Sequence, residues 1–518
     1  MADENIKAVL KLRDTTTGEI YDYEPTSTSG ISFDDLKSAL ETETSERKEA
    51  DEALSSRVSD IELELTYLNP TAFETEILGC EFDFVNDEAT RLCKSIGLEA
   101  YPFDETTVVH DDVTGNDIYV AKSDFDEHYP YSEIRRCNLD DDGNVIAYFG
   151  EDGYTENDYT KQVMVEIPKI YYRVYPVSIK PKRDGGLGYY IEKARYYIAK
   201  EKLAGFKIHP AFVDADGNVK DHVYISAFEA SMYDASLDKI FDDNVDTDSA
   251  MDYTNDRLCS VGNARIISGK TKLITRPSIE TLAQARGARY HGLDHRVTAL
   301  VQLLFAIEYN GFNWSKKLYS STTGGAVDIP DTNASTNNSL NTGSTSNYTC
   351  RACTSKQLIN GTQTDYTTRT QTSFAYRGIE NFYGNVWKYV SGINYHCDAD
   401  NGSQIPYLCT DYNYAESKGT ANYESIGFSL PTSHGYYRYF GWSEKYNYMF
   451  IPTEVIDSNG ASGITGDFLY QANNTSSWYI ALLGGSWNLS SDAGAFYWAS
   501  NNVFDSRSRK IASRLFSI

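Results

Sequence analysis

The spacing of apolar residues divides the first part of the chain into a hairpin and a helix. Residues 8–23 alternate apolar and polar side chains around a Thr/Gly turn, which predicts a two-stranded β-hairpin. Residues 32–68 contain no Gly or Pro and are rich in Glu, Lys, Ala and Ser, so they predict a helix that ends before Asn69-Pro70. Because so small a hairpin is not stable alone, we expect residues 1–30 to pack on a neighbour.

Within this helix the apolar residues recur at alternating spacings of four and three, the seam of a coiled coil. The seam residues are Leu54, Val58, Ile61, Leu65 and Leu68. Upstream, Thr44 and Arg47 occupy equivalent positions and dilute the seam. The pattern predicts a short oligomerising stalk over residues 31–69. The alternative is an amphipathic helix packed on its own globular domain.

Short strands separated by turn sequences follow in residues 70–162, which we expect to form a β-rich connecting domain. The acidic turns at 140–144, 150–153 and 214–218 are candidates for calcium, because hard cations prefer clustered carboxylates. They lack the spacing and the final bidentate Glu of a calcium loop, and Asp or Asn beside Gly is what a hairpin turn requires. We interpret them as turns and predict no metal site.

Longer elements are expected from residue 163 onward. Strands are predicted at 163–174, 189–199 and 223–230, and helices at 278–286 and 295–309. 

Two composition changes follow these elements. Residues 320–373 are dominated by Ser, Thr and Asn, which predicts a long surface insertion that is ordered only if its neighbours hold it. Residues 374–518 are dense in aromatic residues and Gly, which indicates a compact domain built more from loops than from long strands.

The acidic composition argues against nucleic acid as a partner. Asp and Glu (74) exceed Lys and Arg (47), giving a formal net charge of −27, and such a surface repels a phosphate backbone unless a basic patch is segregated. The densest basic cluster is too small for that role; it comprises Arg507, Arg509, Lys510 and Arg514.

Membrane insertion and a disulfide scaffold are not expected either. The first residues lack the basic and apolar regions of a signal peptide, and the longest apolar stretch, 299–307, is too short to span a bilayer. Eight cysteines in 518 residues are too sparse for a disulfide framework, which favours synthesis in a reducing cytoplasm. The 41 tyrosines and 22 phenylalanines favour pleated, half-buried surfaces and therefore a β-rich protein.

Two aromatic strings resemble a known fold. Residues 383–390 (Tyr-Gly-Asn-Val-Trp-Lys-Tyr-Val) resemble the Gly-Asn-Val-Trp-Glu-Trp signature of the formylglycine-generating-enzyme type of C-type-lectin-like fold, with Lys388 and Tyr389 in place of Glu and Trp. Residues 483–487 (Leu-Gly-Gly-Ser-Trp) resemble the string that closes this fold, and Arg514 matches the Arg that normally follows it. The resemblance implies a C-type-lectin-like domain at 163–518. With the hairpin, the short coiled coil and the β-rich domain expected before it, the fold class is α+β and β-rich.

Further strings resemble the tail proteins of gut bacteriophages that are targets of diversity-generating retroelements. They lie at 165–172, 205–212, 303–309 and 493–498, so that this likeness runs from about Cys80 to the last residue. It implies a trimeric receptor-binding protein of the phage tail, made in the host cytoplasm and located in the virion. Its partners would be a bacterial surface receptor, either protein or glycan, and other tail or baseplate proteins contacted through residues 1–30.

The same likeness implies a variable region at 484–514. In such proteins a reverse transcriptase misreads template adenines, so that Asn codons become codons for many other residues without creating stops. The expected variable, receptor-binding positions are Ser486, Asn488, Leu489, Asp492, Ala499, Asn501, Val503, Phe504, Asp505, Arg507 and Arg509. The expected scaffold positions are Gly384, Asn385, Trp387, Gly484, Gly485, Trp487, Phe496, Trp498 and Arg514. An exposed mixture of apolar, Arg and Asn side chains is what a recognition surface needs.

Enzymatic functions have weaker support. The formylglycine-generating relatives oxidise cysteine with paired copper-binding cysteines near the C-terminus, and no cysteine follows Cys409 here, so neither this activity nor a cofactor is expected. A zinc site at Cys350 and Cys353 would lack its second half, and His396-Cys397 is a similarly weak candidate. His291 and His295 are interpreted as capping or packing residues.

Two alternatives to receptor binding stay open. A glycan-degrading tail enzyme needs only a pair of carboxylates, and with 74 acidic residues some pair always looks suitable. A structural baseplate or tail protein would share the hairpin and the coiled coil, so these elements do not discriminate.

Overall fold

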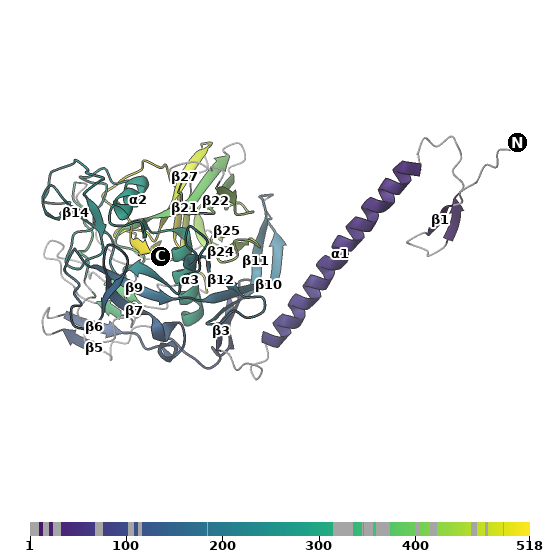
Figure 1. Ribbon diagram of the computed structural model, residues 1–518, viewed down its shortest axis with the longest axis horizontal. Coiled ribbons are helices and arrows are strands. Elements are labelled where there is room, and N and C mark those ends of the chain that lie inside the picture. The colour runs from purple at the N-terminus through teal and green to yellow at the C-terminus, as the bar shows by residue number, and fades with distance from the viewer. Residues whose placement is uncertain are drawn as a thin grey trace. The chain divides into compact units, whose positions relative to one another are not determined.

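The computed structural model divides the chain into two compact units, Met1–Thr66 and Tyr67–Ile518, which we describe separately (Figure 1). The structure describes residues 10–13, 20–23, 33–67, 76–101, 108–111, 116–183, 185–313, 335–343, 345, 356–358, 373–398, 403–414, 422–456, 464–471, 475–489 and 492–518.

The first unit contains the predicted hairpin and helix. Strands β1 (Leu10–Arg13) and β2 (Ile20–Tyr23) pair antiparallel, with Leu10 opposite Tyr23. Helix α1 (Phe33–Tyr67) confirms the predicted helix to within a residue at each end. The described seam residues remain accessible along α1, where Leu54 is 58% exposed, Ile61 47% and Leu65 62%, whereas Leu68 lies outside the described residues. A continuous apolar stripe on one helix therefore lies open to solvent.

The second unit is β-rich and contains one large mixed sheet, in which β12, β10, β11, β24, β26, β28, β27, β21, β22 and β23 follow one another. The members of this sheet are β3 (Ile77–Asp83), β4 (Glu88–Cys93), β10 (Tyr171–Pro181), β11 (Tyr189–Ala199), β12 (Lys207–Ile208), β21 (Trp387–Asp398), β22 (Ser403–Cys409), β23 (Tyr423–Ser425), β24 (Gly435–Trp442), β25 (Pro452–Ile456), β26 (Phe468–Gln471), β27 (Ser477–Leu483), β28 (Trp498–Asn502) and β29 (Ile511–Ala512).

Smaller sheets complete the second unit. One has the order β17-β30-β13-β9-β7-β8, with β7 (Arg135–Leu139), β8 (Val145–Tyr148), β9 (Gln162–Pro168), β13 (His222–Ser226), β17 (Tyr290–Gly292) and β30 (Leu515–Ser517). The others contain β14 (Ser231–Asp234), β15 (Lys239–Ile240) and β16 (Arg257–Cys259), and β5 (Val108–Asp111), β6 (Asn116–Val120), β18 (Lys356–Leu358), β19 (Ser373–Tyr376) and β20 (Ile379–Glu380).

The helices of the second unit lie near their predicted positions. Helix α3 (His295–Tyr309) matches its prediction at both ends and is buried along its whole length. The Asp294 carboxylate accepts the N–H of Val297 at its start, and left-handed Asn310 ends it. Helix α2 (Arg276–Gln284) begins two residues earlier than predicted, with a Pro in its first turn. Short 3-10 helices span Asp124–Glu127, Tyr131–Glu133 and Pro210–Phe212.

Several predicted boundaries were wrong. The strand expected at 163–174 is two strands, because β9 ends at Pro168 and β10 begins at Tyr171 in a different sheet. The strand expected at 223–230 ends at Ser226. The connecting domain expected at 70–162 is not a separate unit, since β3 pairs along β11 and β7 pairs along β9. Long-range strand pairing therefore joins these residues to the rest of the second unit.

The Ser/Thr/Asn-rich insertion is partly built into the core. Among its described residues, Asn337, Ser339 and Thr342 are almost fully buried. The Thr342 hydroxyl donates to the carbonyl of Val261, and the Asn337 amide donates to Asp243 and to the carbonyl of Ile266. The expectation of a surface insertion was thus wrong for these residues. Their polar side chains can be buried because they form hydrogen bonds with backbone carbonyls and a carboxylate inside the fold.

Two of the acidic turns, at 140–144 and 214–218, are hydrogen-bonded within themselves. At 140–144 the Asp140 carboxylate accepts the N–H of Asp142, the N–H of Asn144 and the Asn144 side-chain amide, and Asp214 does the same at 214–218. These are the contacts that the interpretation as turns predicts.

Among the described residues, no helix is both long enough and apolar enough to cross a membrane.

Candidate functional site

A pocket of about 400 Å³ lies among β26, β27 and β28 and the loop that follows β27; we call it the C-terminal pocket. Its lining includes several residues expected to vary: Ser486, Asn488, Leu489, Ala499 and Asn501. The other lining residues are Trp387, Tyr470, Leu482, Tyr497, Asn502, Ser508, Lys510 and Ile511.

Strand pairing explains how distant residues meet in this pocket. Ala499 of β28 lies opposite Tyr470 of the parallel strand β26 and opposite Leu482 of the antiparallel strand β27. Trp387 lies opposite Ile511 where β21 and β29 run parallel, and its ring meets that of Tyr497 at a centroid distance of 4.8 Å. The pocket lining therefore combines aromatic and aliphatic side chains with amide groups.

The expected variable residues differ in their exposure. Ser486 and Ala499 are 1% and 2% exposed, which corrects the expectation that all of these side chains lie on an open surface. Asn488, Leu489 and Asn501 are half-buried. They lie within reach of a ligand in the pocket, because they belong to its lining.

The remaining expected variable residues lie outside the pocket lining. Val503 and Phe504 are 40% and 38% exposed, and Asp505 and Arg507 are also exposed. These neighbours form a surface segment with apolar anchors, which is common in binding sites. 

Two further members of the expected variable set have partners inside the protein. The Asp492 carboxylate accepts a hydrogen bond of 2.5 Å from the hydroxyl of Tyr436. Arg509 is half-buried, donates to the carbonyl of Thr336 and lies 5.7 Å from the ring centre of Trp487. Both side chains thus contribute to local structure.

The two strings that were compared with the lectin-like fold, 383–390 and 483–487, meet directly. The N–H of Gly384 donates to the carbonyl of Gly484, and the N–H of Trp487 donates to the carbonyl of Asn385, each at 2.8 Å. Gly484 has φ +92°, and a Cβ there would lie 3.0 Å from Tyr383 Cα, so this approach requires glycine. Residues a hundred positions apart thus form one structural joint.

A buried ion pair supports the same joint. Lys388 Nζ lies 2.7 Å from a carboxylate oxygen of Glu229 and donates to the carbonyl of Gly384, and the Asn385 amide donates to the other Glu229 oxygen. Both charged side chains are at most 2% exposed. Burial lowers the pKa of Lys388 to about 8. Lys388 occupies the Glu position of the signature, and Glu229 supplies the opposite charge.

Most other expected scaffold residues are buried. Trp487, Phe496, Trp498 and Arg514 have no exposed surface, and the Trp498 indole donates to the carbonyl of Phe450. Trp387 differs, because it is half-buried and lines the C-terminal pocket. 

Several residues of the C-terminal pocket were not predicted from the sequence, because they lie outside the expected variable region 484–514. Tyr470 comes from β26 and stacks on His434 with ring centroids 5.5 Å apart, and Leu482 comes from β27. Strand alternation could have marked Tyr470 as outward-facing, but nothing local indicates which strands neighbour β28.

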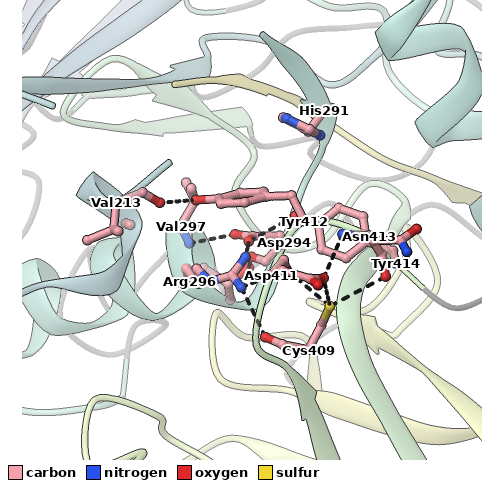
Figure 2. Close-up of polar contacts among 12 residues, drawn as sticks. Val213, His291, Asp294, Arg296, Val297, Cys409, Asp411, Tyr412, Asn413 and Tyr414 are labelled. Carbon is pink, nitrogen blue, oxygen red and sulfur yellow. Dashed lines mark hydrogen bonds and ion pairs between the residues drawn. The ribbon is translucent and has the colours of Figure 1, made fainter. Parts of the chain in front are cut away.

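A second polar cluster joins the start of α3 to the end of β22 (Figure 2). Arg296 pairs with Asp294 at 3.0 Å and donates to the carbonyls of Cys409 and Asp411. Its guanidinium lies 4.3 Å from the ring centre of Tyr412. The geometry is that of a structural clamp, since the charged groups are satisfied by one another and by the backbone.

Within this cluster, Cys409 is poorly suited to act as a nucleophile. Its thiol lies 3.0 Å from the carbonyl of Asp411 and 3.3 Å from that residue's carboxylate. Burial raises its pKa to about 12, so the thiolate is rare at neutral pH.

The histidines singled out in the sequence pack inside the fold. His291 Nδ1 lies 2.7 Å from a Glu280 carboxylate oxygen, and its ring stacks on Phe516. His295 is the first residue of α3 and is completely buried. His396 packs its ring on Trp478, whereas Cys350 and Cys353 lie outside the described residues. In the described part of the chain, no three His, Cys, Asp or Glu side chains gather to hold a metal ion.

Comparison with models of known protein families and with curated proteins found no match for this sequence.

Proposed function

We propose that this protein is a phage tail adhesin that binds a bacterial surface receptor at the C-terminal pocket and the adjoining segment 503–507. The observation that carries this proposal is the agreement between two independent sets of residues. Positions that the tail-protein likeness expects to vary are also positions that line the pocket, among them Asn488, Leu489 and Asn501.

The chemistry of this surface suits recognition. Asn amides in the pocket lining can both donate and accept hydrogen bonds, and rings such as those of Trp387 and Tyr470 supply apolar contact area. Half-exposed Phe504 offers an anchor beside the pocket. Because the scaffold under the pocket is built from buried rings and a buried ion pair, substitutions at the lining positions can change the receptor without unfolding the domain.

A C-type-lectin-like domain at residues 163–518 belongs to this proposal. It is supported by the joint between residues 383–390 and 483–487, where two short strings resembling one fold are hydrogen-bonded to each other. Residues 1–30 would attach the protein to the tail or baseplate, and the protein would be located in the virion.

Removing side chains from the pocket lining is expected to weaken binding to host bacteria strongly. Replacing Asn488, Leu489 and Asn501 together by Ala removes amide partners and apolar contact area, so we expect the fraction of full-length protein bound to intact host cells to fall at least about tenfold. Flow cytometry with labelled protein measures this fraction.

The matched control keeps the pocket intact. Val219→Ala with Leu237→Ala shortens two exposed apolar side chains outside the pocket and should leave cell binding unchanged. Unchanged binding of the pocket variant, with its thermal unfolding unaltered, would contradict the proposed site.

Self-association through α1 would multiply weak single contacts. The exposed seam of Leu54, Val58, Ile61 and Leu65 is what a parallel coiled coil buries, and several linked domains engaging one cell raise the apparent affinity strongly. We therefore propose that the protein is a homotrimer.

Charging the seam is expected to separate the chains. With Leu54→Lys and Ile61→Lys, light scattering after gel filtration should give the mass of a single chain, because buried like charges oppose packing. Ser56→Lys with Ser59→Lys adds the same charge off the seam and should leave the oligomer intact. A monomeric parent protein would refute self-association.

A further inference from the structure

A second pocket, of about 570 Å³, lies beside β14 and β16 and is separate in its lining from the C-terminal pocket. One side of it is aromatic. The rings of Tyr159 and Tyr233 are nearly parallel, with centroids 4.7 Å apart and an interplanar angle of 13°, and both are partly exposed. We call this the tyrosine pocket. Because stacked rings cover each other's inner faces, the pair offers the outward face of one ring as a flat apolar shelf.

Polar groups of Arg257, Asp141 and Arg286 adjoin the shelf, and we call them the polar wall. Arg257 lies directly opposite Tyr233 in the pairing of β14 with β16, so their side chains are neighbours on one face. The Arg257 guanidinium donates to one oxygen of Asp141 at 2.9 Å, and Arg286 donates to the other oxygen at 2.5 Å. Aromatic and hydrogen-bonding groups therefore stand side by side.

The wall is held rigidly before any ligand arrives. Arg286 is buried, and it also donates to the carbonyl of Leu258 and to the sulfur of Cys259. The Tyr290 hydroxyl donates to the carbonyl of Asp140, which fixes the turn that carries Asp141. A preformed site avoids much of the ordering cost of binding.

The balance of charge and polarity defines the ligand class. Asp141 and Asp252 in the lining offset Arg257 and Arg286, which favours a neutral ligand. A purely apolar ligand would strip water from these groups without replacing its hydrogen bonds. A sugar ring is neutral and suits both the aromatic and the polar part of the pocket. One face of the ring carries C–H groups, and its edge carries hydroxyls that donate and accept hydrogen bonds.

We propose that the tyrosine pocket binds a neutral saccharide. The C–H face of the sugar lies on the outward ring face of the stacked pair of Tyr159 and Tyr233, and its hydroxyls bond to Arg257, Asp141 and the exposed amide of Asn255. This site does not depend on the receptor-binding role of the C-terminal pocket.

Saturation-transfer NMR on the full-length chain tests the proposal with methyl pyranosides of glucose, galactose, mannose and N-acetylglucosamine at millimolar concentration. We expect at least one of them to receive saturation at its ring protons. Tyr159→Ala and, separately, Asn255→Ala should weaken its binding at least about tenfold. The second substitution is at an exposed position, so it tests the site even if the first disturbs folding.

The matched controls are Tyr470→Ala and Asn501→Ala in the C-terminal pocket, which should leave saccharide binding unchanged. Absence of binding by every sugar, or binding insensitive to both Tyr159→Ala and Asn255→Ala, would overturn the proposal. Loss of saccharide binding in the control variants alone would place the sugar in the C-terminal pocket. This result would overturn the tyrosine pocket as the saccharide site and leave the receptor proposal intact.

Discussion

Replacing Lys388 by Met is expected to lower the free energy of unfolding by about 3–5 kcal/mol, because the carboxylate of Glu229 would stay buried without its cation. The side chain of Glu229 is 2% exposed, and its other oxygen is held by Asn385. Urea unfolding followed by tryptophan fluorescence measures the difference. This pair holds the joint between residues 383–390 and 483–487. Lys388→Met should therefore also destabilise the C-terminal pocket.

An exposed ion pair supplies the control for this substitution. Lys445 pairs with Glu424 at the surface, where the side chains are 60% and 48% exposed, and Lys445→Met should cost no more than about 1 kcal/mol. Adding Glu229→Gln to Lys388→Met removes the stranded charge and should recover part of the stability. Equal losses in Lys388→Met and Lys445→Met would mean that the buried pair has no special role.

Acidification below about pH 6.5 is expected to destabilise the protein through His209 and His295. Burial lowers the pKa of each to about 3 from an ordinary value of 6.5, so the unfolded chain binds protons in this range while the folded chain does not. Between pH 6.5 and about pH 5, each histidine should therefore remove about 2 kcal/mol from the free energy of unfolding. Above pH 6.5 this effect is absent.

Asp467 opposes the two histidines. Burial raises its pKa to about 7 from 3.8, so the folded state takes up this proton first and gains stability as the pH falls between these values. The expected net loss from pH 6.5 to 5 is thus about 2 kcal/mol, the contribution of one histidine. 

Urea unfolding at both pH values separates these contributions, because comparison with the parent protein cancels the other titrating groups. Asp467→Asn should double the net loss to about 4 kcal/mol, and His295→Gln should nearly abolish it. A parent protein equally stable at both pH values, together with an unchanged slope in His295→Gln, would contradict the assignment.

Only part of the C-terminal pocket could be predicted from the sequence. Asn488, Leu489 and Asn501 could be named from the chain because they alternate with glycines and aromatics in a motif of recognisable order. Tyr470 and Leu482 could not, since they reach the pocket by pairing on either side of Ala499. Ser486 was assigned to an open surface, but the fold places it at 1% exposure.

The sequence by itself determined the elements that depend on near neighbours in the chain. The spacing of apolar residues defines α1 and its seam, and α3 follows from an apolar run that begins after Asp294 and ends at Asn310. Only the tertiary structure decided that β3 pairs along β11, that Glu229 meets Lys388, and that Tyr470 borders the pocket. Helix periodicity and capping act over a few residues, whereas strand order and buried charge pairing depend on how the whole chain packs.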